Sequence, residues 1–480
     1  MSNINLCFPF NVRTDVELLK DIVEYVLQKL PRRYKSQCKG LVGIQEHYEQ
    51  IQSLLKLGLS EVRTLGIWGM GGLGKTTLAR ALYDNLSHEF EGSCFLSNVR
   101  EKADKNPSFH ESSITRLLVK KGLVVLDDVD TSEQLEKILG DCDSLGPGSR
   151  VIVTTRNKQV LSRIDDVYQV EELRSHLSRQ LFCLTVFGEK QPRKGYEDLS
   201  KRVLSYCKGI PLALKVLGAS LRQKSKEVWE SELRKLQKIP NIQIHKVMKL
   251  SYDGLDRSQK DIFLDIACFF KRGKRDWVTR LLEDFDFFAT SGIEVLLDKA
   301  LITISDGNRI EMHDLIQEMG WEIVHQECIK DPGRRSRIWR PEEVLDVLKH
   351  SRVSGRCNFF CLRTHLSLEC TSNLCFVFQG TDVVEGMILN LTKLKGDICL
   401  SSDAFTKLPN VRFLRFRHWW DCNFDIRFPN GLESLPDKLR CLEWDRFCLE
   451  SLPPKFCAEQ LVELHMHHSK LKKLWDGVQV

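Results

Sequence analysis

The sequence predicts a multidomain protein of mixed α/β and α architecture. We expect a parallel α/β domain built around a glycine-rich loop, then a helical domain, a winged-helix domain and a short leucine-rich-repeat solenoid. Three observations support this prediction: a strand, a glycine-rich loop and a helix at 65–86, alternating strands and helices up to residue 172, and apolar positions that recur after residue 411. The 480 residues, 42% hydrophobic and 28% charged, suffice for about three globular domains.

The glycine-rich stretch Gly69-Met70-Gly71-Gly72-Leu73-Gly74-Lys75-Thr76-Thr77 fits G-x-x-x-x-G-K-[ST], the pattern of a P-loop. Glycines let backbone N–H groups face phosphate oxygens, and the start of the following helix adds positive charge. We therefore expect Lys75 to neutralise the β- and γ-phosphates and Thr76 to hold Mg²⁺. The other expected phosphate-binding residues are Gly69, Gly71, Gly72, Gly74 and Thr77. A chance glycine-rich turn is the alternative.

Acidic and basic residues follow the later strands of this domain. Phe95–Val99 is the expected second strand, Leu123–Asp130 the third and Val151–Thr155 the fourth. Carboxylates at a strand end beside a P-loop suit Mg²⁺, so Asp127 is a predicted metal ligand and Asp128 a candidate catalytic residue that polarises water. A helix cap is the alternative, because Thr131 and Gln134 resemble a capping box. Arg156 is expected to contact a γ-phosphate; the alternative interpretation is an ordinary surface arginine.

The middle of the chain reads as helical. Gly209 is expected to stop one helix and Pro211 to start the next. The turn 305–308 lies between two short apolar runs, which predicts a β-hairpin followed by a helix from His313 to Val324. Helices with a hairpin indicate a winged-helix module. Such modules often bind DNA, and a basic cluster lies nearby at Arg334, Arg335, Arg337 and Arg340. However, no aromatic interleaving accompanies it, which argues against nucleic acid.

Apolar positions recur in the last part of the chain. Val411, Leu414 and Phe416 match Leu439, Leu442 and Trp444, and these match Leu461, Leu464 and Met466. The last step of 22 residues lies within the leucine-rich-repeat range. One short strand per repeat is expected to line a concave face.

The composition limits which kinds of partner and which cellular compartment are expected for this chain. A net charge of +6 is too small to indicate nucleic acid or a membrane. The 17 cysteines have no regular spacing, and several lie in apolar runs, such as Cys183 and Cys268, where reduced thiols are expected. No apolar run is long enough for a membrane span, and no secretory signal is visible. The expected location is cytoplasmic, with the nucleus as an alternative.

The order of motifs resembles plant intracellular immune receptors of the nucleotide-binding, leucine-rich-repeat family. Gly69–Thr77 is similar to the family's P-loop, Leu123–Asp130 to its second kinase motif and Gly148–Arg156 to its sensor motif. Residues 209–213 resemble its Gly-Leu-Pro-Leu element, and residues 312–314 its Met-His-Asp motif. Asp130 is typical of the branch with an N-terminal Toll/interleukin-receptor (TIR) domain.

The resemblance implies ADP or ATP, with Mg²⁺, as cofactors. It places Val42 and Gly43 against the base, Pro211 near adenine and His313 against ADP. It also implies the following parts: a linker helix at 1–40, a P-loop nucleotide-binding domain at 41–172, a helical domain at 173–245, a winged-helix domain at 246–350, an irregular insert at 351–382 and partial leucine-rich repeats at 383–480.

The sequence also departs from the family. From the residues at hand, we expect the linker helix to lack a preceding TIR domain and the repeats to stop after about three strands. Gln45 and His47 stand where relatives often have Asp and Arg. Residues 353–379 lack helical or alternating periodicity, which suggests a retained non-coding insert. Their cysteines, Cys357, Cys361, Cys370 and Cys375, lack the paired spacing of structural zinc sites.

Three functional hypotheses follow. The leading one is an ADP/ATP-dependent molecular switch of plant innate immunity, whose repeats bind a pathogen effector or a guarded host protein. The second is an enzyme, for which at most slow ATP hydrolysis is expected. The third is a non-catalytic adaptor or decoy that pairs with a full-length receptor or with itself.

Overall fold

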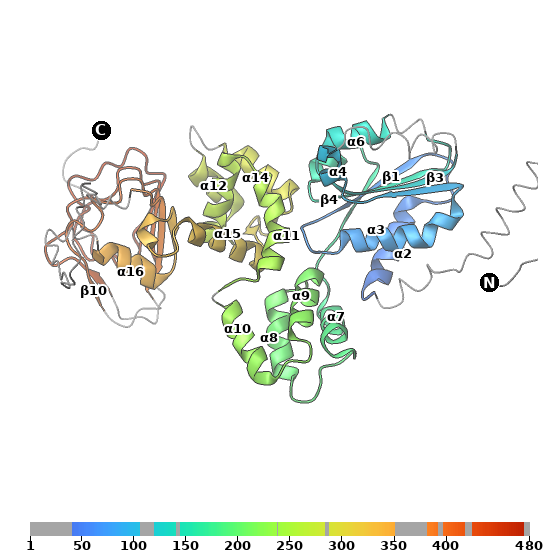
Figure 1. The fold of residues 1–480 in the computed structure, drawn as a ribbon. Helices are drawn as coiled ribbons and strands as arrows, with labels where there is room; N and C mark the ends of the chain where they lie inside the picture. The colour runs from blue at the N-terminus through green and yellow to red at the C-terminus, as the bar shows by residue number, and fades with distance from the viewer. Residues whose placement is uncertain are drawn as a thin grey trace, which may run out of the picture.

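The computed structural model describes residues 41–105, 120–140, 145–237, 239–283, 288–350, 382–391, 397–417 and 425–474. Figure 1 shows an α/β part in blue, a helical part in green, a second helical part in yellow and a β-rich part in orange and brown. The expected linker helix at 1–40, the insert at 353–379 and the four cysteines of the zinc alternative lie outside the described residues. Among the residues that are described, no helix is long and apolar enough to cross a membrane.

The first part is a five-stranded parallel sheet in the order β2-β3-β4-β1-β5. Alternate residues of each strand face opposite sides: Val125 packs toward α2 and α3, whereas Val124 and Leu126 pack toward α6. Figure 1 shows these helices on the two faces of the sheet. The strands are β1 (Arg63–Trp68), β2 (Gly92–Leu96), β3 (Gly122–Val129), β4 (Arg150–Thr155) and β5 (Asp166–Gln169). The helices are α2 (Ile44–Leu55), α3 (Lys75–Leu86), α4 (Val99–Lys105) and α6 (Ser132–Leu139), with short 3₁₀ turns at Ser87–Glu89 and Lys158–Leu161.

The parallel α/β prediction is confirmed, with two differences in its elements. Strand β2 ends at Leu96, so the expected strand at 95–99 is wrong in its second half. Asn98 has a left-handed φ of 53°, which interrupts an extended chain, and the fully buried Val99 begins α4. Strand β5 was not expected. Its residues alternate between half-buried and exposed, a weak signal for a strand at the edge of a sheet.

The second part is a bundle of α7 (Ser175–Phe187), α8 (Glu197–Cys207), α9 (Pro211–Leu221) and α10 (Lys226–Leu236). Trp229 is almost fully buried, and its ring packs against those of Phe182, Phe187 and Tyr196. Helix α8 ends before Gly209, and Pro211 is the first residue of α9, as the sequence predicts.

The third part has the helices and hairpin of a winged helix. The antiparallel strands β6 (Thr303–Ile304) and β7 (Ile310–Glu311) confirm the predicted hairpin. The following helix, α15 (Asp314–Glu327), begins one residue after His313, which caps it. The other helices are α11 (Ile242–Asp253), α12 (Arg257–Asp265), the π-helix Ile266–Phe270, α13 (Arg275–Leu282) and α14 (Ala289–Asp298).

The fourth part is a parallel sheet in the order β14-β13-β11-β9-β8. Leu414 pairs with Leu442, and Leu442 with Leu464, which confirms the register read from the repeats. The strands are β8 (Arg337–Ile338), β9 (Gly386–Asn390), β11 (Phe413–Arg417), β13 (Cys441–Trp444) and β14 (Glu463–His465). A second small sheet pairs β10 (Ile398–Cys399) with β12 (Ile426–Arg427). Strand β9 adds a repeat unit before the three that the sequence aligned.

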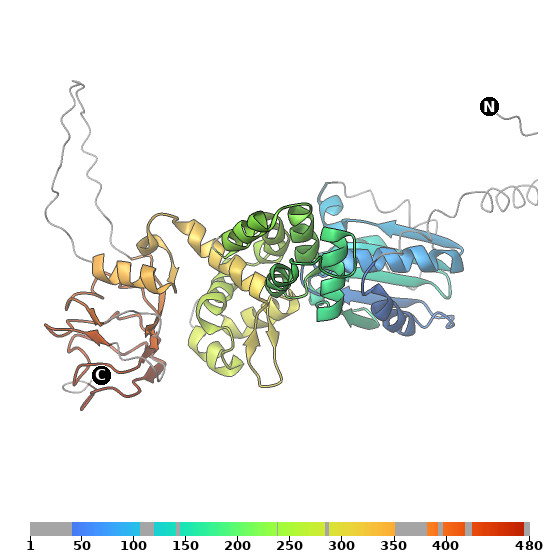
Figure 2. The ribbon, with the colours of Figure 1, turned by 90° about the horizontal axis from the view of Figure 1, so that it is seen from below.

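The winged-helix part leads directly into this solenoid. Strand β8 pairs with β9, and α16 (Pro341–His350) shares a hydrophobic core with the repeats through Val344 and Leu348. Figure 2 shows the winged-helix part lying between the α/β part and the repeats. Arg335 and Arg337 of the basic cluster are buried in this junction and paired with carboxylates. Two of its four arginines are therefore not available as a basic surface for nucleic acid.

Candidate functional site

The P-loop joins β1 to α3. Gly69, Gly72 and Gly74 have positive φ angles of 151°, 87° and 95°. At Gly72 the space is also closed, because an added Cβ would lie 3.1 Å from Leu212 Cβ in the helical part. The backbone N–H of Leu212 donates to the Gly72 carbonyl at 3.1 Å. Glycine is thus required both by the turn and by a neighbouring domain.

Lys75 is enclosed by the loop that precedes it. Its Nζ donates to the carbonyls of Gly69 (2.6 Å) and Met70 (2.8 Å), and the side chain is only 7% exposed. Burial, reinforced by the positive charge of Arg156, lowers the pKa of Lys75 to about 7. Phosphate oxygens would add to the negative charge of Asp127 and Asp128 and favour the charged form of Lys75.

Asp127 lies at the end of β3, opposite the start of α3. Its Oδ1 accepts from Thr76 Oγ1 (2.8 Å) and from Thr154 Oγ1 (2.7 Å). The other oxygen, Oδ2, is buried and has no hydrogen-bond partner among the described residues. A buried carboxylate oxygen without a partner is costly unless a cation or water satisfies it. The hydroxyl of Thr76 and the carboxylate of Asp127 are hard oxygen ligands of the kind that Mg²⁺ prefers.

Asp128 adopts a left-handed conformation, with a φ of 61°, at a bulge between β3 and β4. Its backbone N–H donates to Thr154 Oγ1 at 2.9 Å. The carboxylate is shared by two arginines: Oδ2 lies 2.7 Å from Arg100 Nη2, and Oδ1 lies 3.5 Å from Arg156 Nε. The carboxylate lines a pocket that Lys75 and Thr76 also line, which we call the phosphate pocket, and these two ion pairs hold it in place.

Arg156 connects this pocket to the winged-helix part. Its Nη1 donates to the backbone carbonyl of Val247 on α11 at 2.6 Å. Burial lowers the pKa of Arg156, while Asp128 acts against that shift. Arg156 and Val247 line the same pocket as Lys75, Thr76 and Asp128. One side chain therefore contacts both the pocket and the helix that begins the next domain.

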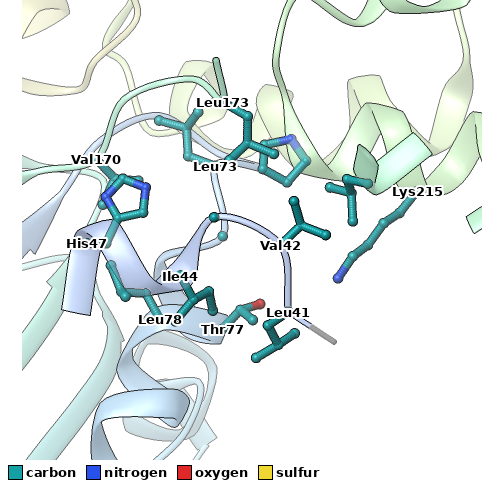
Figure 3. Close-up of a pocket in the computed structure, with 14 residues that line it drawn as sticks. Leu41, Val42, Ile44, His47, Leu73, Thr77, Leu78, Val170, Leu173 and Lys215 are labelled. Carbon is teal, nitrogen blue, oxygen red and sulfur yellow. The ribbon is translucent and has the colours of Figure 1, made fainter. Parts of the chain in front are cut away.

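A second, mostly apolar pocket adjoins the first. Gly74, Thr77, Pro211 and Lys215 line both pockets. The apolar walls come from the start of α2 and the segment before it, from the P-loop and α3, from the segment between β5 and α7, and from α7: Val42, Ile44, Leu73, Leu78, Val170, Leu173 and Leu181. Figure 3 shows Val42 and Leu173 on its wall, with Lys215 on one side and His47 on the other. The predicted base-contacting residues Val42, Gly43 and Pro211 thus meet here.

His313 lies elsewhere, in a cleft on the far side of the P-loop that Gly69, Met70 and Leu73 also line. Its Nδ1 accepts from the Leu315 N–H (3.1 Å), so the proton sits on Nε2, which donates to the Lys208 carbonyl (3.4 Å). Burial lowers the pKa of His313. The structure does not bring His313 into the pocket of Lys75, and its contact with ADP stays a prediction.

The sequence analysis missed Thr154 and Arg100 as parts of the site. Thr154 could have been found, because neighbouring parallel strands end at the same edge of a sheet and Thr154 directly follows the buried run of β4. Arg100 could not, since residues 95–99 read as a strand and the turn at Asn98 gave no signal.

The sequence comparisons agree with this architecture. Residues 44–106 and 95–192 match the NB-ARC domain, residues 256–328 match the winged-helix domain described as Disease resistance protein Roq1-like, and residues 460–479 match a leucine-rich repeat. Disease resistance protein RPV1 of Vitis rotundifolia is 39% identical over 513 aligned residues, which cover 97% of this chain and 35% of RPV1. The chain therefore contains an NB-ARC domain and is similar over nearly its whole length to plant disease resistance proteins.

Other relatives give the same result. Disease resistance protein RUN1 of Vitis rotundifolia is 38% identical over 96% of this chain and 36% of its own length. TMV resistance protein N of Nicotiana glutinosa is 34% identical over 96% of this chain and 40% of its own length. The chain thus spans between a third and two fifths of the length of each of these three relatives. The P-loop and its surroundings lie within the part of the chain that matches the NB-ARC domain.

Proposed function

We propose that this chain is an ADP/ATP-dependent switch in plant innate immunity. The observation that carries the proposal is the position of Arg156, which contacts Asp128 at the phosphate pocket and Val247 O in the winged-helix domain. A γ-phosphate in this pocket would attract the guanidinium, which lies 15% exposed at its edge. Arg156 would then release Val247, and the winged-helix domain would lose a hydrogen bond to the NB-ARC domain.

The other residues of the site would bind nucleotide or hold the domains together in the ADP state, the ATP state or both. Lys75 and the P-loop glycines would hold the phosphates common to ADP and ATP. Mg²⁺, held by Thr76 and Asp127, would supply positive charge to the phosphate oxygens. Leu212 and Pro211 bring the helical domain against the P-loop in the described structure. His313, which bonds Lys208 O, would help to keep the winged-helix domain docked in the ADP state.

The names of the relatives support the biological setting. They are disease resistance proteins, and we infer that this chain takes part in the same kind of defence signalling. Its repeats would bind a pathogen effector or a guarded host protein. The buried, free thiols of Cys183, Cys207 and Cys268 fit a reducing compartment such as the cytoplasm.

Slow ATP hydrolysis is the second candidate function. Asp128 lines the phosphate pocket, but Arg100 and Arg156 share its carboxylate. A carboxylate engaged in this way is better suited to holding arginines in place than to activating water.

Mass spectrometry of the nucleotide released from purified protein tests the proposal. We expect stoichiometric ADP in the parent protein and none in Lys75→Arg, because a planar guanidinium cannot replace a compact ammonium that two carbonyls enclose. Equal ADP content in both proteins would show that the P-loop is not the binding site. Rapid turnover of added ATP, with no nucleotide retained, would favour the enzyme.

A further inference from the structure

The apolar pocket beside the P-loop has few polar side chains. Among its lining residues, only His47, Thr77 and Lys215 carry polar groups. Thr77 and Lys215 also line the phosphate pocket, whereas His47 does not. His47 therefore lies at the end of the site away from the phosphates, and Figure 3 shows it beside Val170, across the pocket from Lys215. A nucleotide whose phosphates lie at Lys75 would direct its base toward this end.

The ring of His47 is held by a chain of hydrogen bonds. Tyr168 Oη donates to Gln50 Oε1 at 2.8 Å, so its single proton is used there. Its oxygen then accepts from His47 Nδ1, which lies 2.6 Å away. The two rings meet edge to face, with centroids 5.9 Å apart. This chain fixes the neutral tautomer of His47, with the proton on Nδ1 and a lone pair on Nε2.

The surroundings of His47 keep it neutral. Burial lowers its pKa, although the carboxylates of Glu46 and Glu171 act in the opposite direction. A neutral imidazole with Nδ1 engaged offers one free function, the acceptor Nε2.

We propose that His47, held by Tyr168 and Gln50, selects the purine by accepting a hydrogen bond from its 6-amino group. The inference rests on the proposed nucleotide function and adds the residue that reads the base. Adenine presents an amino donor at position 6, whereas guanine and hypoxanthine present a carbonyl acceptor there. A lone pair on Nε2 would attract the first and repel the second. The apolar walls would bind either ring, so discrimination would come from His47.

The test compares the affinities of ADP and inosine diphosphate, whose purine differs from adenine in the 6-carbonyl and in the proton that N1 then carries. Both would compete with a fluorescent methylanthraniloyl-ADP probe on the nucleotide-stripped full chain. We expect the parent protein to prefer ADP by roughly tenfold or more. His47→Phe keeps an aromatic ring but removes the acceptor, and should abolish most of this preference. Tyr168→Phe removes the hydroxyl that holds the proton on His47 Nδ1, so that His47 can adopt either neutral tautomer, and should also reduce the preference.

The control is Tyr83→Phe, which removes a hydroxyl bonded to Ser93 Oγ at 3.1 Å and should leave the preference unchanged. Melting temperatures would verify folding. If His47→Phe does not fold, the preference for ADP measured in Tyr168→Phe tests the proposal. A preference that survives in the folded variants, or equal affinities in the parent, would overturn the role of His47 and leave the nucleotide switch intact. Failure of the parent to bind either nucleotide would instead refute the proposed function.

Discussion

The winged-helix domain has two interfaces of opposite character. Toward the NB-ARC and helical domains its hydrogen bonds include three to backbone carbonyls. Arg156 Nη1 donates to Val247 O (2.6 Å), Trp68 Nε1 to Asp298 O (2.9 Å) and His313 Nε2 to Lys208 O (3.4 Å). The cleft that contains His313 is also lined by Gly69, Met70 and Leu73 of the P-loop. Each of these hydrogen bonds contributes about 1 kcal/mol.

Toward the repeats the same domain is joined by buried charges. Asp265 is fully buried, and its two oxygens lie 2.6 Å from Arg337 Nε and 3.0 Å from Arg412 Nη2. Although burial acts against charge, Asp265, Glu385 and Asp261 together raise the pKa of Arg337 above its ordinary value.

Arginine and aromatic side chains extend this second interface. Arg415, 2% exposed, donates to Phe269 O at 2.8 Å, and the rings of Phe269, Phe270 and Phe413 pack together. An added Cβ at Gly386 would lie 2.4 Å from the Phe269 ring, so the repeats approach the domain closely. We infer that the winged-helix domain and the repeats move as one body when the first interface opens.

The largest expected effect comes from Asp265→Ala. Removing this carboxylate leaves two buried guanidinium groups short of a partner, which should lower the free energy of unfolding by about 3–5 kcal/mol. Urea denaturation measures the change. Arg280→Ala is the matched control, because Arg280 pairs with Glu463 at 67% exposure and should cost at most about 1 kcal/mol. If the two variants lost similar free energies of unfolding, the buried ion pairs of Asp265 would stabilise the junction no more than the exposed pair of Arg280.

The nucleotide site should be sensitive to pH where the repeat junction is not. Free Lys75 loses its proton near pH 7, and phosphates favour its charged form, so bound nucleotide raises the pKa of Lys75. Binding therefore takes up a proton above pH 7, and ADP affinity should fall by up to about tenfold per pH unit from 7.5 to 9. Calorimetry in buffers of different ionisation enthalpy measures the uptake directly. An affinity that is constant across this range would mean that Lys75 is already charged in the free site.

Arg156→Ala should weaken only the first interface. Loss of its bond to Val247 O removes about 1 kcal/mol from the docking of the winged-helix domain, and hydrogen exchange of residues 244–254 should quicken about fivefold. Arg163→Ala, whose arginine is 80% exposed and paired with Glu136, serves as the control and should change nothing. If both variants exchange like the parent, Arg156 does not hold α11.

The smallest effect is expected for Asp314→Val. Asp314 pairs with Lys271 (2.6 Å) and with Lys208 of the helical domain (3.5 Å), but it is 49% exposed. Its loss should shift the balance toward the ATP form by less than about 1 kcal/mol, or up to fivefold in the ADP:ATP ratio of purified protein. His313→Ala removes both the helix cap and the bond to Lys208 O and should shift the ratio in the same direction. An unchanged ratio in both variants would show that this contact does not favour ADP.

The sequence was sufficient for features that depend on local patterns. The P-loop glycines, the buried runs of β3 and β4, the Gly209 stop and the repeat register all follow from spacing, and the structure contains them. Each signal lies within about ten consecutive residues or recurs at a fixed period, so no tertiary information is needed.

Features that depend on contacts between residues far apart in the sequence could not be predicted from the sequence. Nothing in the sequence around Asp265 indicates its partner, because Arg412 lies 147 positions away. Arg337 looked like part of a basic surface, although it is 1% exposed. His47 was noticed only as a departure from its relatives, because its partner Tyr168 lies on the edge strand that the sequence did not reveal.

Hydrogen-exchange mass spectrometry of the full chain, loaded with ADP or with a non-hydrolysable ATP analogue, tests the comparison of the two interfaces most directly. We predict faster exchange with the ATP analogue in residues 244–254 and 296–304, which face the NB-ARC domain. Residues 260–270 and 411–417, which form the junction with the repeats, should exchange at the same rate in both states. Faster exchange at that junction, with residues 244–254 unchanged, would contradict the inference that the winged-helix domain separates from the nucleotide site and stays with the repeats.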